Sequence, residues 1–114
     1  MIRWTDVATW AETLPETTVE SWYGTPGLKV AGKGFARFRC DEEGGVVLYV
    51  THEEKQSLLA LGNPAFYTTP HYDGYAWIIV DLDLVPCSEL EKLLRNAREP
   101  TMPTRLRKLE LGNL

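Results

Sequence analysis

The stretch TPHYDGYAWIIVDL at residues 69–82 is the part of the sequence that decides the fold class. It begins as a loop over residues 69–74, which contains a proline and closes on an Asp-Gly pair typical of turns. It continues as an apolar run over residues 75–82, where β-branched and aromatic side chains favour a strand. Pro86 ends this run. The stretch therefore predicts a loop followed by the strongest strand of the chain.

Further strand and helix signals lie on both sides of this stretch. Short aromatic or β-branched runs separated by turn residues predict strands over residues 28–30, 35–40, 46–50 and 66–68. Apolar residues at helical spacing, bounded by capping and breaking residues, predict helices over residues 5–14, 51–61, 88–97 and 104–111. Residues 17–23 are extended in character, and residues 24–27 have the composition of a turn.

Capping residues give the predicted helix starts. Thr5 is the expected cap of the first helix. Residues 51–54 and 88–91 each have the capping-box pattern, in which a Ser or Thr is followed three residues later by Glu. Each box predicts a helix that begins directly after its first residue.

The order of these elements indicates an α+β fold. Strands come in runs and do not alternate one-to-one with helices, which is typical of an antiparallel sheet backed by helices. The predicted order is α-β(3)-α-β(2)-α, with a short helix after it. Because the chain has 114 residues and no repeat or linker, we expect residues 1–114 to form a single domain.

The composition excludes several classes of protein. Hydrophobic residues make up 44% of the chain, but no apolar run is long enough to predict a membrane-spanning helix. The first residues lack the basic and apolar pattern of a secretory signal, so we expect a cytoplasmic protein. Cys40 and Cys87 belong to no CxxC pair, and two free buried thiols are expected, with a disulfide as the alternative.

Charge is distributed unevenly along the chain. The net charge is −4, which is the wrong sign for a protein whose whole surface binds nucleic acid. From Arg95 onward the sequence has five basic residues and two acidic ones, so the C-terminal region is basic and the remainder is acidic. A basic tail of this kind either binds a polyanion or complements the acidic body of its own chain.

Several segments resemble the MmcQ/YjbR family. They are Trp22-Tyr23-Gly24 with Pro26, the segment Leu28-Lys29-Val30, Phe35-Ala36, residues 69–82, and the helix with Glu89-Leu90 and Leu93-Leu94. The resemblance spans nearly the whole chain, and the Pro-His-Tyr…Gly…Trp segment is its most specific part. It implies an α-β(3)-α-β(2)-α fold shared with secretion-chaperone-like proteins. It also implies a DNA-binding protein, and it brings no catalytic residues.

Cationic residues are the candidates for contacts with nucleic acid. Arg37 and Arg39 share one face of their strand, since side chains alternate with a period of two. The expected phosphate contacts are Arg37, Arg39, Arg95, Arg98, Arg105, Arg107 and Lys108. Aromatic side chains interleaved with cations, as around residues 22–39, also suit single-stranded nucleic acid. The alternative is a chaperone-like domain that binds a protein or peptide, and the sequence leaves monomer and homodimer open.

The loop at residues 69–74 is the candidate site for a small ligand. His71 suits a ligand contact or a proton carrier, whereas a histidine that only pins the loop through backbone hydrogen bonds is the simpler interpretation. The residues assigned to this site are Tyr23, Lys29, His71, Tyr72 and Trp77. Trp77 is expected to belong to the core.

Motifs for catalysis, metals and nucleotides are missing from the sequence. No nucleophile, acid and base set can be assembled, so we expect no enzymatic activity and no cofactor. No closely spaced Cys and His pairs predict a metal site. Asp81 with Asp83, and the acidic residues 41–43, suit a weakly held hard cation, but solvated turn charges explain them better. The glycines around Lys33 fit a hairpin and not a phosphate loop.

Overall fold

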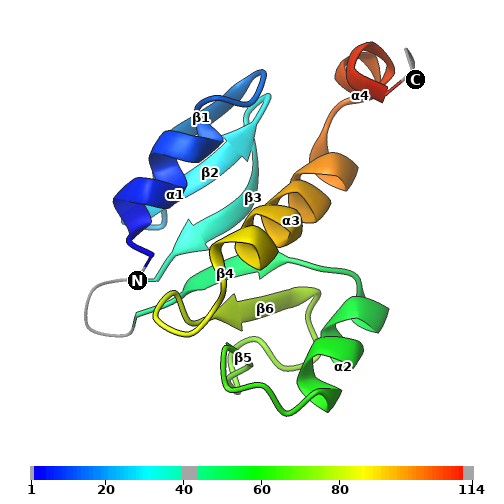
Figure 1. The fold of residues 1–114 in the computed structure, drawn as a ribbon. Coiled ribbons are helices and arrows are strands. Elements are labelled where there is room, and N and C mark those ends of the chain that lie inside the picture. Colours follow the sequence, from blue (N-terminus) through cyan, green and yellow to red (C-terminus); the bar gives the residue numbers. More distant parts are fainter. Residues whose placement is uncertain (1, 40–43, 112–114) are drawn as a thin grey trace.

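The computed structural model describes residues 2–39 and 44–111 (Figure 1). The elements are α1 (Trp4–Ala11), β1 (Thr17–Trp22), β2 (Thr25–Val30), β3 (Lys33–Phe38), β4 (Val46–Tyr49), α2 (His52–Ala60), β5 (Phe66–Tyr67), β6 (Trp77–Val80), α3 (Cys87–Arg98), the 3-10 turn η1 (Glu99–Thr101) and α4 (Thr104–Leu111). No helix in the described part of the chain is long and apolar enough to cross a membrane.

All strands join one antiparallel sheet in the order β1-β2-β3-β4-β6-β5. This architecture confirms the predicted α+β class. Residues 17–23, predicted only as extended, supply β1, so four strands and not three precede α2. The turn predicted at residues 24–27 was misplaced. It lies at Tyr23 and Gly24, which have φ of 56° and 81°, and Pro26 is inside β2.

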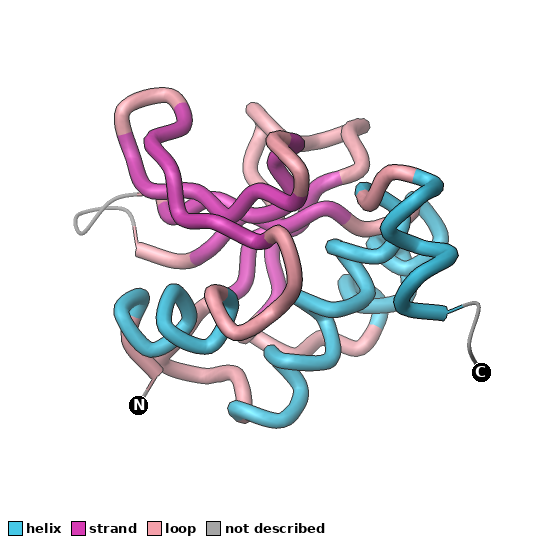
Figure 2. Tube along the Cα trace, turned by 90° about the horizontal axis from the view of Figure 1, so that it is seen from above, coloured by secondary structure: helices cyan, strands magenta, loops and turns pink. Residues whose placement is uncertain are grey.

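The core fills the space between one face of the sheet and the helices. In Figure 2 the helices gather on one side of the strands. Fully buried strand residues on that face include Leu28, Leu48 and Ile78, each 0% exposed. They form one cluster with residues of α1 and α3, such as Ala11 and Leu94. Because each strand alternates its side chains, the neighbouring positions point to the opposite face.

A β-bulge gives β3 an extra residue on the core face. Lys29 pairs with Gly34 and Leu28 pairs with Ala36, so Phe35 has no partner across the ladder. As a result Phe35 and Ala36 are both buried, although they are consecutive in the strand. The bulge adds a large ring to the core and reverses the alternation after it, so that Arg37 pairs with Gly27 and lies on the face opposite the core.

Helix starts follow the predicted capping chemistry in part. The box at Thr51 is confirmed, with its hydroxyl accepting from the Glu54 N–H at 3.1 Å. The first helix begins earlier than predicted, because Arg3 and not Thr5 is the cap, and the Asp6 carboxylate accepts from the Arg3 N–H. The box predicted at Ser88 is wrong, since α3 already begins at Cys87 after Pro86.

Three further predictions change with the structure. The strand predicted over residues 75–82 is shortened to β6, which lengthens the loop before it. The first helix ends at Ala11 and not near residue 14. Cys87, expected to be buried, is exposed at the start of α3. Cys40 and the acidic residues 41–43 lie outside the described residues.

Candidate functional site

The face of the sheet opposite the core carries a row of residues from several strands. The register aligns Arg37 of β3 with Gly27 of β2 and with Val47 of β4, and it continues through Ile79 to Tyr67. Paired residues in an antiparallel sheet point to the same side. We call this side the open face. Val47 and Ile79 are almost completely buried, although they lie outside the helix-backed core, so other side chains cover them.

Trp22 lies flat across this face over two glycines. A Cβ atom added to Gly27 or Gly34 would stand 2.9 Å and 2.5 Å from the indole ring, closer than side chains approach each other. The indole also meets Trp77 edge-on, with 5.8 Å between ring centroids. Tyr49 contacts Trp77 in the same way at 5.9 Å. The two strand glycines therefore make room for a large ring on the open face.

Tyr23 occupies the tip of the β1–β2 hairpin in an unfavourable conformation. Its φ of 56° lies in the left-handed region, which glycine and asparagine adopt readily and bulky side chains avoid. The ring is 85% exposed and stacks beside Trp22 with 6.2 Å between centroids. An exposed aromatic ring in a strained backbone position is an outlier of the kind that gathers at binding sites.

The loop between β5 and β6 closes the site from the other side, and Lys55 holds it in place. Lys55 belongs to α2 and is only 4% exposed. Its ammonium donates to the backbone carbonyls of Tyr72 at 2.7 Å and Tyr75 at 2.9 Å. Thr68 and Asp73 add a hydrogen bond of 3.0 Å inside the loop. A buried cation thus fixes the backbone that carries the ring of Tyr72.

Sequence reasoning missed Lys55, and the signal for it was weak. Lys55 precedes Leu58 and Leu59 by three and four residues, so it lies on the apolar face of its helix. A lysine in that position usually extends along apolar surface and keeps its charge in water. Its partners here are carbonyls of a remote loop, which the local sequence does not indicate.

Arg37 links the strand to this loop. Its guanidinium donates to the Thr25 hydroxyl at 3.1 Å and to the Tyr72 hydroxyl at 2.9 Å. His71 packs edge-on against the Tyr72 ring with 4.7 Å between centroids. Since the Tyr72 oxygen accepts a hydrogen bond from Arg37, its own O–H can donate elsewhere.

These side chains enclose a pocket of about 260 Å³ on the open face. Its lining residues are Trp22, Tyr23, Arg37, Val47, His71, Tyr72 and Trp77. None of these described lining residues carries a carboxylate. A volume below about 300 Å³ suits one planar group and is smaller than the usual pocket for a whole cofactor. The pocket therefore combines aromatic walls with hydrogen-bond donors.

Two larger hollows differ from this pocket in the charges that line them. One of about 640 Å³ lies beside the start of α1. It also gathers rings beside a cation, Arg3, but Asp81 and Asp83 line it as well. The other, of about 710 Å³, lies between α2 and α3, and its described lining includes three glutamates and no aromatic ring. Volume alone would favour these hollows, but the carboxylates in both would repel an anionic ligand.

The structure brings together most of the residues predicted for a small-ligand site. Tyr23, His71, Tyr72 and Trp77 all line the pocket. Trp77 is half-buried on the open face, so its predicted place in the core was wrong. Lys29 points to the same face, because its neighbours Leu28 and Val30 face the core, but it does not line the pocket.

The predicted nucleic-acid contacts divide into two separate groups. Arg37 lines the pocket, and Arg39 lies nearby, with its guanidinium donating to the Tyr67 hydroxyl at 3.0 Å and standing 6.0 Å from the ring centroid. Both arginines are on the open face, two residues apart in the sequence. The C-terminal group, from Arg95 to Lys108, belongs to α3 and α4.

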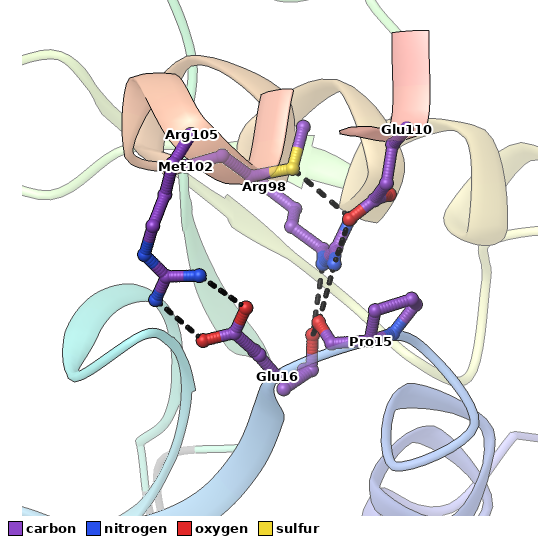
Figure 3. A network of polar contacts seen from close by, with 7 residues as sticks. Pro15, Glu16, Arg98, Met102, Arg105 and Glu110 are labelled. Carbon is purple, nitrogen blue, oxygen red and sulfur yellow. Dashed lines mark hydrogen bonds and ion pairs between the residues drawn. The ribbon is translucent and has the colours of Figure 1, made fainter. Parts of the chain in front are cut away.

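Arg98 in the C-terminal group is a buried structural residue. It is 5% exposed and donates to the Thr17 hydroxyl, the Pro15 carbonyl and the Met102 sulfur. Two further N–H groups meet the Glu110 carboxylate at 3.0 Å each (Figure 3). A guanidinium enclosed in this way has no surface to offer a phosphate, so the prediction of a nucleic-acid contact was wrong for Arg98.

Three of the four remaining C-terminal cations also contact their own chain. Arg105 forms a two-pronged ion pair with Glu16 at 2.7 and 2.8 Å (Figure 3). This contact lowers the pKa of Glu16 and raises the pKa of Arg105 from their ordinary values. Arg95 stands over the Trp10 ring, and Arg107 donates to the Glu99 carbonyl. Lys108 is exposed on α4.

Metal ligands do not gather in the described part of the chain. Residues 2–39 and 44–111 contain no group of three His, Cys, Asp or Glu side chains that could hold a metal ion. The Asp81 carboxylate accepts from the Asp83 N–H at 2.9 Å, which is the behaviour of a turn residue.

Comparisons with known proteins place these features in a wider group. The model of the family described as YjbR matches residues 12–99. A solved protein from Pseudomonas syringae is 17% identical, with a TM-score of 0.70, and the match covers 88% of this chain and 99% of that one. A Deinococcus radiodurans protein with a domain named DUF419 is 21% identical, with a TM-score of 0.73, over 95% and 86%. Among curated proteins no match was found.

Proposed function

Because the chain belongs to the YjbR family, we propose that it is a non-enzymatic, cytoplasmic DNA-binding module that takes single strands on the open face of its sheet. The observation that carries the proposal is the pocket of about 260 Å³ with aromatic walls and Arg37 among them. Unpaired bases stack on aromatic side chains, and nearby cations attract the phosphates between them. A duplex keeps its bases stacked inside and cannot enter such a pocket.

The charges on the open face support the binding of a single strand, although the net charge of the protein is negative. Lys29 and Arg37 point to this face, and Arg37 has hydroxyl partners, whereas Arg98 and Arg105 of the C-terminal group meet carboxylates of their own chain. Glu20 is the acidic member of the same row, and its carboxylate accepts from the Thr18 hydroxyl at 2.7 Å. The two cations Lys29 and Arg37 predict a shallow salt dependence, with log K falling at a slope of about −1.4 against log salt.

The first experiment is a fluorescence-anisotropy titration with labelled single-stranded and duplex oligonucleotides at low and physiological salt. We expect single strands to bind with Kd below about 10⁻⁵ M and duplexes to bind more weakly. The variant Arg37→Gln should lose about tenfold in affinity, since it removes the cation of the pocket. Arg107→Gln changes the net charge equally on α4 and serves as the matched control.

Comparing the two variants shows whether the open face or the C-terminal region binds the oligonucleotide. Equal losses for Arg37→Gln and Arg107→Gln would show that binding follows net charge and not the pocket. Preference for duplex would overturn the single-strand mode. Thermal unfolding of both variants checks that they fold, because Arg37 also holds Thr25 and Tyr72.

A free small ligand is the second candidate, and the size of the pocket favours it. A volume of about 260 Å³ accepts one planar group, and the net charge of −4 opposes a long polyanion more than a single charged ligand. A thermal-shift screen with small aromatic carboxylates and nucleotides tests it. Stabilisation that Arg37→Gln removes, together with no oligonucleotide binding, would replace the first candidate by the second.

A further inference from the structure

We infer that the open-face pocket selects guanine among the unpaired bases, an inference that rests on the proposed binding of single strands. The inference starts from the polar groups in the pocket lining. Arg37 and the Tyr72 hydroxyl can both donate to a ligand, and none of the described lining residues carries a carboxylate that would accept a base N–H. A base that presents only acceptors along one edge fits such a donor pair best.

Arg37 is held in a fixed orientation while it keeps donors for a ligand. One terminal nitrogen donates to the Thr25 hydroxyl and the other to the Tyr72 hydroxyl. A guanidinium has further N–H groups beyond the two used in these contacts. Its planar fork matches two adjacent acceptors, and fixing it beforehand reduces the entropy lost on binding.

The Tyr72 hydroxyl extends the same donor array. Its oxygen accepts from Arg37 at 2.9 Å, so its O–H is left to donate to an acceptor on a ligand. The ring cannot move away easily, because Lys55 holds the backbone carbonyl of Tyr72 at 2.7 Å and His71 packs against the ring. The donors of the pocket are therefore part of a braced structure.

Guanine is the base whose edge best matches the donors of Arg37 and Tyr72. Its O6 and N7 atoms are adjacent acceptors, and an arginine fork binding both is the commonest specific base contact. Adenine places an amino donor beside N7, which would face the Arg37 cation and the Tyr72 proton. The two-ring purine also offers the larger face for stacking against Trp22 and Tyr23, which are stacked on each other.

The test uses thymidine oligomers of about ten nucleotides with one central dG, dA or dC, titrated by anisotropy. We expect the dG oligomer to bind about tenfold more tightly than the other two. A fourth oligomer carries 7-deaza-dG, which lacks only the N7 acceptor and keeps the stacking surface. Its affinity should fall to that of the dA oligomer. This control changes the ligand and leaves the protein intact.

A variant of the protein checks the same point from the other side. Arg37→Lys keeps the positive charge and loses the planar fork, so the preference for dG should disappear while the salt slope stays the same. Equal affinity for dG and 7-deaza-dG, or tighter binding of dC, would overturn the inference. If every oligomer bound equally, guanine selection would be overturned, but the proposed binding of single strands would stand. If no oligomer bound, both guanine selection and the proposed binding of single strands would be overturned.

Discussion

The open face and the C-terminal region are both rich in cations, but they use them differently. At the C-terminal end, Arg98 directs its donors to a carboxylate, a hydroxyl, a carbonyl and a sulfur of the same chain. Arg105 likewise directs both ends of its fork to Glu16. On the open face, Arg37 uses hydroxyl partners and meets no carboxylate in the described hydrogen bonds. It retains its full charge for a ligand.

This difference shows that the partners of a cation matter more than the number of cations in a region. A buried guanidinium that is paired with a carboxylate, as Arg98 is, joins two parts of a fold, because removing the partner would leave a buried charge uncompensated. A guanidinium held by hydroxyl groups, as Arg37 is, is oriented without a negative charge beside it. We therefore assign the C-terminal arginines Arg98 and Arg105 to stability and Arg37 to binding.

Removal of Arg98 should have the largest effect on stability. We expect Arg98→Met to lower the free energy of unfolding by about 3 kcal/mol, because Glu110 and the Pro15 carbonyl lose a buried charged donor. Urea denaturation measures this loss. At temperatures where the variant is folded, its affinity for single strands should equal that of the wild type. A loss below about 1 kcal/mol, or weaker binding by the folded variant, would remove the distinction between the two regions.

Replacement of Lys55 should affect both stability and binding. Lys55→Met removes the donor shared by the carbonyls of Tyr72 and Tyr75, which should cost about 2 kcal/mol and loosen the loop. We expect faster hydrogen exchange in residues 69–76 and a loss of oligonucleotide affinity of about tenfold. Lys92→Met, an exposed lysine of α3, is the matched control. Unchanged loop exchange would contradict the bracing role of Lys55.

The sequence predicts the layout of the fold better than its buried polar contacts. The strand at residues 75–82, although it is shortened to β6, the capping box at Thr51 and the hairpin beside Lys33 all depend on local chemistry, which short segments of the sequence reveal. Two partners of Arg98, Glu110 and Thr17, lie 12 and 81 residues away from it in the sequence. No local pattern specifies such pairs.

The hairpin tip was missed for a different reason. Pro26 and Gly27 have the composition of a turn, whereas the observed turn places a tyrosine at a position that favours glycine or asparagine. A segment that departs from its local preference is expected where function competes with folding. The pocket itself was half predicted: its loop residues were identified, but Trp22 and Val47 were not assigned to a small-ligand site, and their place in it follows from the sheet register.

Substitution of Tyr23 should move stability and binding in opposite directions. Tyr23→Asn suits the left-handed backbone, so we expect the free energy of unfolding to rise by about 0.5–1 kcal/mol. The same change removes an exposed stacking ring and should weaken single-strand binding about tenfold. Tyr23→Phe keeps the ring and should change neither quantity much. If Tyr23→Asn bound as tightly as the wild type, the strained tyrosine would have no part in the site.

The smallest effect should come from the exposed ion pair between Arg105 and Glu16. Arg105 lowers the pKa of Glu16 in the folded state, so the pair stabilises the fold above the pKa of the unfolded carboxyl, about 4.3. This contribution is lost as the pH falls through the lower folded pKa. The wild type should therefore unfold at a slightly higher temperature than Glu16→Gln at pH 7, and the difference should vanish near pH 3. Salt should reduce it at neutral pH, since both side chains are well exposed. A difference that persisted in acid would mean that Glu16 acts through its backbone position, where φ is 51°, and not through its charge.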